Sequence, residues 1–97
     1  MRQVIVRYRV KKERVEEHEG LVRAVFKELA QKAPPGIRYA ALKQADGVSF
    51  VHIAFVEAAK NPLDAIAAFT AFTAKIGERC DEPPKVEEMT EIGAYGL

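Results

Sequence analysis

Residues 37–57, IRYAALKQADGVSFVHIAFVE, contain two apolar segments on either side of an Asp-Gly pair. The segments 37–44 and 48–57 have the length and composition of strands. The pair Asp46-Gly47 between them is a strong signal for a tight hairpin turn. The stretch therefore predicts two antiparallel strands. The second is apolar on both faces, which is typical of a strand in the centre of a sheet.

The chain before this hairpin predicts a strand followed by a helix. Residues 3–10, QVIVRYRV, alternate between an apolar face and a mixed face, as a strand does. From about Glu13 to Lys32, apolar residues instead recur every three or four positions, which indicates an amphipathic helix. The helix is expected to end by Pro34, because prolines lack the amide hydrogen that a helix needs.

The chain after the hairpin predicts a second helix and a last strand. Asn61-Pro62 is a helix start, since Asn accepts from free amides as N-cap and Pro fits the first helical position. Helical spacing continues to about Arg79, and residues 85–95 are compatible with a final strand. The order is therefore βαββαβ, an α+β ferredoxin-like arrangement in which two helices cover one face of an antiparallel sheet. The other sheet face is left open.

The bulk composition bounds the class of protein. A length of 97 residues predicts one domain over residues 1–97, and 48% hydrophobic residues is an ordinary globular value. The formal charge of +1 is far from that of a nucleic-acid binder. The single cysteine, Cys80, cannot form an internal disulfide, so a cytoplasmic protein is expected. No apolar stretch is long enough for a membrane span, and no membrane partner is expected.

Apolarity assigns the faces of the two central strands. The helix side is expected to carry Val4, Val6, Tyr8, Val51, Ile53 and Phe55. The open side is then expected to carry Ile5, Arg7, Arg9, Val48, Phe50, His52 and Ala54. Such a face is too apolar for water and too polar for a plain core. We therefore expect a homodimer through the open sheet face.

The acidic last segment offers partners for the charges on that face. Its carboxylates could pair with the arginines or the histidine, from the same subunit or from the other one. The three candidate carboxylates are Glu87, Glu88 and Glu91.

Three segments together resemble a known family. They are VIVRYRVKKERVEEHEGLVRAVF at the start, VSFVHIAFVE in the hairpin, and FTAFTAKIGERC followed by EPPKVEEMTEIGAY. With these segments the chain resembles the antibiotic biosynthesis monooxygenase-like domains of the dimeric α/β-barrel superfamily over nearly its full length. The resemblance lies in hydropathy and element order.

The resemblance implies a class of chemistry. Known enzymes of that family oxidise phenolic polyketides without a metal or bound flavin, or degrade haem, in a pocket between sheet and helices. The haem degraders rely on an Asn in the first strand, a Trp, and a His in a helix. Here the matching strand reads Val6-Arg7-Tyr8, the chain has no Trp, and the second helix has no His. The resemblance therefore argues against haem degradation and implies no cofactor.

Two histidines are candidate catalytic residues. His52 could act as a general base, since its ordinary pKa lies near neutrality. The alternative is a histidine at the subunit interface, hydrogen-bonded to a carboxylate. His18 lies at the margin of the apolar stripe of the first helix, from which it could face a pocket. The alternative for His18 is an ordinary boundary residue of an amphipathic helix.

Two tyrosines complete the candidate catalytic set. Tyr8 and Tyr39 lie on predicted strands, and their phenols could orient an aromatic ligand on the helix side. The alternative is a core tyrosine with a satisfied hydroxyl. No metal site is expected, because His18 and His52 lie on different elements without ligand spacing around either.

Two functions remain open from the sequence. One is a cofactor-independent monooxygenase that acts on a small aromatic, quinol-like or polyketide-like substrate. The other is a non-catalytic homodimeric module that binds a small ligand or serves a structural role. A pocket of ~300 Å³ or more with convergent polar groups would favour ligand binding or catalysis, whereas solid packing would count against both.

Overall fold

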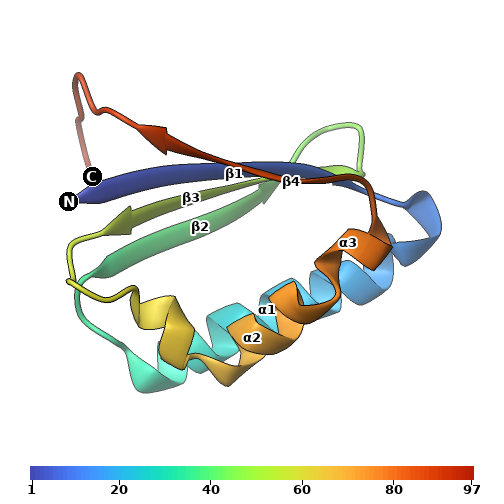
Figure 1. Ribbon diagram of the computed structural model, residues 1–97, viewed down its shortest axis with the longest axis horizontal. Helices are drawn as coiled ribbons and strands as arrows, with labels where there is room; N and C mark the ends of the chain where they lie inside the picture. The colour runs from blue at the N-terminus through green and yellow to red at the C-terminus, as the bar shows by residue number, and fades with distance from the viewer.

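The computed structural model describes residues 1–97 as a four-stranded sheet with helices packed against it (Figure 1). In chain order the elements are β1 (Arg2–Val10), η1 (Lys12–Arg14), α1 (Val15–Lys32), β2 (Ile37–Lys43), β3 (Ser49–Val56), η2 (Pro62–Ala65), α2 (Ala67–Ala74), α3 (Ile76–Arg79) and β4 (Cys80–Met89). No helix has both the length and the apolarity required to cross a membrane.

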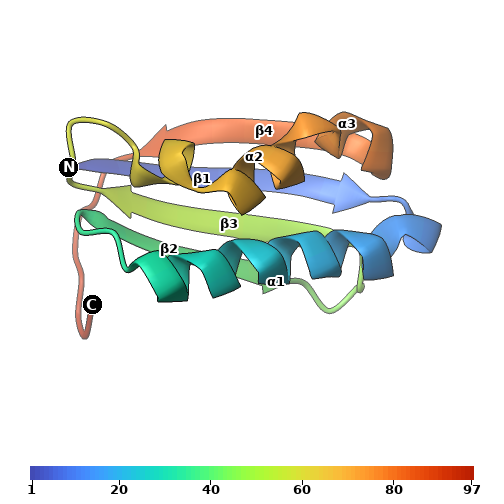
Figure 2. The same cartoon turned by 90° about the horizontal axis from the view of Figure 1, so that it is seen from below.

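The strand order is β2-β3-β1-β4, and every neighbouring pair is antiparallel. The helices lie side by side on one face of the sheet, while the opposite face has no covering layer (Figures 1 and 2). The predicted α+β ferredoxin-like arrangement is confirmed, with β1 and β3 in the centre of the sheet.

The predicted turn and the predicted helix start are both present. The Asp46 carboxylate accepts hydrogen bonds from the amides of Val48 at 3.0 Å and Ser49 at 2.8 Å. Gly47 has a φ of 79°, which glycine adopts without a steric penalty. At the start of η2, the Asn61 side chain accepts from the amide of Leu63 at 3.0 Å, as an N-cap residue does.

The predicted second helix and last strand need correction. The single helix expected to reach Arg79 is divided into η2, α2 and α3, and Lys75 between the last two has non-helical angles. The strand expected over 85–95 instead spans Cys80–Met89 and includes two prolines. Proline is tolerated there because β4 is an edge strand and the pairing register shifts at that point. The strand ends where β1, its only partner, begins.

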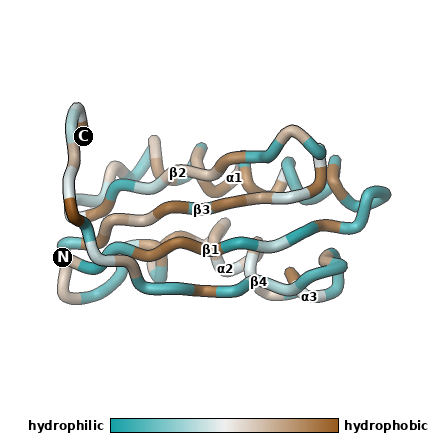
Figure 3. Tube along the Cα trace, turned by 90° about the horizontal axis from the view of Figure 1, so that it is seen from above, coloured by the Kyte–Doolittle hydropathy of each residue, from teal (hydrophilic) through white to brown (hydrophobic).

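The prediction of which β3 side chains point towards the helices is wrong. Val6 of β1 lies opposite His52, and Tyr8 lies opposite Phe50, so each pair shares one sheet face. His52 and Phe50 are each only 4% exposed, beneath the helices. The strand is hydrophobic along most of its length (Figure 3), so apolarity alone could not fix its phase. Pairing with β1 decides which β3 side chains point towards the helices.

The open face therefore carries the other half of β3. The residues on it include Ile5, Arg7, Arg38, Leu42, Val51, Ile53, Phe55 and Glu87. Arg7 pairs with Glu87 at 3.7 Å, and Arg9 pairs with Glu82 at 2.9 Å. The expected carboxylate partner for Arg7 is thus found within the same chain, whereas Arg9 uses a residue that the sequence did not single out.

Candidate functional site

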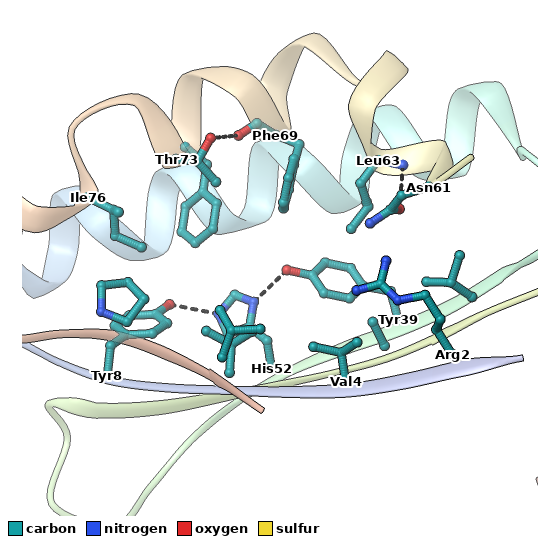
Figure 4. Close-up of a pocket in the computed structure, with 16 residues that line it drawn as sticks. Arg2, Val4, Tyr8, Tyr39, His52, Asn61, Leu63, Phe69, Thr73 and Ile76 are labelled. Atoms are coloured by element: carbon teal, nitrogen blue, oxygen red, sulfur yellow. Dashed lines mark hydrogen bonds between the residues drawn. The ribbon is translucent and has the colours of Figure 1, made fainter. Parts of the chain in front are cut away.

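A cavity of about 320 Å³ lies between the helix-side face of the sheet and the helix segments that follow β3. Apolar side chains form most of its wall, among them Val4, Val6, Ala54, Val56, Leu63, Phe69, Phe72 and Ile76. Figure 4 shows Tyr8, His52 and Tyr39 on the sheet side of this space, facing Phe69 and Ile76 on the helix side. The cavity is therefore an apolar chamber with a line of polar groups along its floor.

These polar groups belong to one continuous series of hydrogen bonds, here called the His–Tyr chain. The hydroxyl oxygen of Tyr8 lies 2.6 Å from Nε2 of His18 and 2.7 Å from Nε2 of His52. The hydroxyl oxygen of Tyr39 lies 2.5 Å from Nδ1 of His52. At the other end, Nε of Arg79 donates to Nδ1 of His18 at 3.2 Å.

Five elements of the fold supply the His–Tyr chain and the arginine at its end. Tyr8 and His52 come from the two central strands, and Tyr39 comes from β2, where it lies opposite Ala54 of β3. His18 comes from the first half of α1, and Arg79 is the last residue of α3. The break in the helical segment before α3 accompanies the inward position of Arg79, which is 2% exposed.

Burial keeps both histidines neutral at physiological pH. Loss of hydration, together with the neighbouring His18, lowers the pKa of His52 to about 4. Loss of hydration, together with the adjacent Arg79 cation, lowers the pKa of His18 to about 4. Burial raises the pKa of both Tyr8 and Tyr39 above the ordinary tyrosine value. All four groups therefore serve as neutral hydrogen-bond donors and acceptors.

Arg79 is the functional candidate that the sequence did not single out. Its Nη2 donates to the carbonyl oxygen of Phe72 at 2.5 Å, and the guanidinium lies 5.8 Å from the centre of the Phe72 ring. It forms no salt bridge. One arginine at the end of a helix has no distinctive spacing, so only the fold reveals its contact with His18.

The four predicted site residues, His52, Tyr8, Tyr39 and His18, are brought together in one network. The alternative position of His52 at a subunit interface on the open face is wrong, because the residue is buried beneath the helices. The alternative for His18, an ordinary residue at the boundary between the apolar and polar faces of the helix, is also wrong, because its side chain is fully buried. No group of three or more His, Cys, Asp or Glu side chains is arranged to hold a metal ion.

Comparison with solved structures places this geometry among known folds. A Nitrosomonas europaea protein provisionally named an antibiotic biosynthesis monooxygenase superposes with a TM-score of 0.77 and 20% identity, over 96% of this chain and 100% of the other. The chain has the fold of antibiotic biosynthesis monooxygenases. Two further proteins share it. Rv0793 from Mycobacterium tuberculosis has a TM-score of 0.76 and 20% identity, over 96% of each chain.

Another protein with this fold is a variant of SnoaB, a cofactor-independent oxygenase from Streptomyces nogalater. It superposes with a TM-score of 0.70 and 17% identity, over 99% of this chain and 97% of that protein. By sequence alone, no protein-family model and no curated protein matches the chain. At these identities the likeness establishes the fold.

Proposed function

We propose that the protein is a cofactor-independent monooxygenase that oxidises a small, electron-rich aromatic compound of the hydroquinone class. The observation that carries this proposal is the cavity of about 320 Å³, with apolar walls and the Tyr39–His52 pair at its floor. Its volume falls in the range of ~300–1,000 Å³ typical of small-molecule sites. The solved structures with this fold, one of which is a cofactor-independent oxygenase, support the same reaction class.

The substrate supplies every electron that the proposed reaction needs. Loss of a phenolic proton makes a hydroquinone rich enough in electrons to reduce molecular oxygen directly. One oxygen atom replaces a ring hydrogen, the other leaves as water, and the hydroquinone becomes a hydroxyquinone. The protein's part is to exclude water with apolar walls and to hold the phenolic oxygen against Tyr39.

The cavity volume limits the size of the substrate. A cavity of ~150 Å³ holds one benzene ring. A volume of about 320 Å³ therefore suits an aromatic compound with one or two rings. Hydroquinones and naphthohydroquinones should be oxidised with a higher kcat/KM than three-ring anthrones.

Oxygen consumption with a panel of hydroquinones and anthrones tests the proposed activity. We expect His52→Ala and Tyr8→Phe to lower kcat/KM at least ~10-fold, since a positioned polar group contributes at least that much to such steps. Tyr95→Phe is the matched control, because Tyr95 is fully exposed near the C-terminus. Absence of turnover by the wild type with every compound would contradict the enzymatic function.

A non-catalytic module that binds a small aromatic ligand is the second candidate. The neutral state of His52 favours it, because an imidazole with a pKa of about 4 is a weak base at neutral pH. The variant Ala54→Phe fills the cavity from its sheet side. Ligand binding that Ala54→Phe abolishes, without oxygen consumption by the wild type, would favour this second function.

The open sheet face supports a homodimer. Val51, Ile53 and Phe55 lie on this face with Ile5 and the half-exposed Leu42. A face this apolar is rarely left to water in a monomer. A second copy laid against it would bury these side chains and leave the cavity, on the other side of the sheet, within each subunit.

A further inference from the structure

The direction of the His–Tyr chain is fixed at its Arg79 end. A guanidinium only donates hydrogen bonds, so Nδ1 of His18 must accept the bond from Arg79. A neutral imidazole has one proton, which in His18 is therefore on Nε2. That nitrogen lies 2.6 Å from the hydroxyl oxygen of Tyr8, so His18 donates and Tyr8 accepts.

The same reasoning continues from Tyr8 towards the cavity. Tyr8 has one hydroxyl proton, and because its only other partner, Nε2 of His18, is a donor, Tyr8 donates this proton to Nε2 of His52 at 2.7 Å. His52 is neutral, so its own proton is on Nδ1, which lies 2.5 Å from the hydroxyl oxygen of Tyr39. Each group accepts from the Arg79 side and donates towards the cavity. The opposite direction would place a proton on Nδ1 of His18, against the N–H of Arg79.

Tyr39 is the last member of this series. Its oxygen accepts from His52, and its own O–H makes no hydrogen bond to another protein group. Tyr39 also lines the cavity, where Figure 4 shows its hydroxyl on the floor beside His52. Among the four His and Tyr side chains of the series, the one unused donor is thus presented to the ligand space.

We propose that the His–Tyr chain is a one-way series of donors, oriented by Arg79, that makes the cavity selective for an aromatic ligand with an anionic oxygen, a phenolate or an enolate. This inference rests on the proposed function, in that it names the form of the aromatic compound bound at that same site. Arg79 is a positioning residue, because it acts through His18, Tyr8 and His52 without touching the ligand.

The selectivity has a simple electrostatic cause. A hydrogen bond to a charged acceptor is about twice as strong as one between neutral groups, and apolar surroundings strengthen it. Bonds aligned in one direction polarise one another, and here the buried Arg79 charge lies at the donor end of the series. The Tyr39 hydroxyl should therefore lower the pKa of a bound phenol, against the effect of the apolar walls, which raise it as burial raises the pKa of Tyr39 itself.

Binding of 4-nitrophenol tests this property without any need for turnover, because its phenolate absorbs visible light. We expect the bound phenol to be about 10-fold more acidic in the wild type than in Tyr39→Phe, the size expected of one charge-assisted hydrogen bond. Arg79→Met should reduce this increase in acidity by half or more. The matched controls are Tyr95→Phe and Arg23→Met, both at exposed side chains.

The possible results separate this inference from the proposed function. The inference is overturned if the wild type binds no 4-nitrophenol, or if the phenol bound to the wild type is no more acidic than the phenol bound to Tyr39→Phe. Tyr39→Phe decides the outcome if Arg79→Met fails to fold. An increase in acidity without oxygen consumption by any hydroquinone would support the anion site and reject the oxygenase. Oxygen consumption without the increase in acidity would support the oxygenase and reject the anion site.

Discussion

Arg79 donates from Nε to Nδ1 of His18 across 3.2 Å inside the core. A buried guanidinium is usually paired with a carboxylate, because an uncompensated charge in the interior is costly. Here the charge is met only by an imidazole nitrogen and by the carbonyl oxygen of Phe72. The charge therefore opposes protonation of His18 and leaves a buried cation at one end of the His–Tyr chain.

The two buried histidines should make the protein less stable in mild acid. The pKa of His18 and of His52 falls from 6.5 to about 4 on folding. Between these values the unfolded chain binds protons that the folded chain does not, so the free energy of unfolding decreases as the pH falls. We expect a loss on the order of 3 kcal/mol for each histidine by about pH 4. Urea unfolding at a series of pH values measures it.

The upper part of that pH range isolates the histidines. Folding lowers the pKa of Glu17, Glu19 and Glu28 from 4.5, so these carboxylates lose their contribution only in more acidic solution. Between about pH 7 and pH 5 the decrease should therefore come from His18 and His52, and His52→Gln should make it shallower. A free energy of unfolding that stays constant over this range in the wild type would refute the burial of neutral histidines.

Two glycine substitutions should have opposite effects on stability. Gly36 has a φ of 83°, and an added Cβ would lie 3.0 Å from the Cβ of Ala58. Gly36→Ala should therefore destabilise the protein by ~1–3 kcal/mol. Gly20 lies inside α1 with no atom within 4 Å of an added Cβ, so Gly20→Ala should stabilise it by ~0.5–1 kcal/mol. Thermal unfolding of both variants measures these changes in stability. Changes in the same direction for both variants would contradict the prediction.

The proposed dimer should depend on the open sheet face. Light scattering at micromolar concentration is expected to give twice the chain mass of 10.8 kDa. Ile53→Lys places a charge on that face and should give the monomer mass with the helix content unchanged. Ala24→Lys adds the same charge to an exposed position of α1 and should remain dimeric. A wild type that is monomeric under these conditions would remove the dimer from the proposed function.

Local chemistry predicts most of the fold. The Asp46-Gly47 turn, the Asn61 cap and the stop before Pro34 each depend on one or two residues, and each is found where expected. The order of elements follows from the change between strand and helix periodicity. These features are local, so the sequence alone is enough to identify them.

The phase of β3 and the role of Arg79 depend instead on contacts between distant segments. β3 is apolar on both faces, so its sequence fits either orientation, and only the pairing of Val6 with His52 decides between them. Arg79 meets His18 from 61 positions away. The sequence therefore identified the four His and Tyr side chains of the site but neither their common face nor the residue that orients them.

The protonation of its two histidines reveals the direction of the His–Tyr chain. The protein has only two histidines, so long-range ¹H–¹⁵N correlation NMR can assign both rings without ambiguity. At pH 7 we expect opposite tautomers, with the proton of His18 on Nε2 and that of His52 on Nδ1. A His52 ring protonated on Nε2, or a doubly protonated His18, would contradict the direction of the chain.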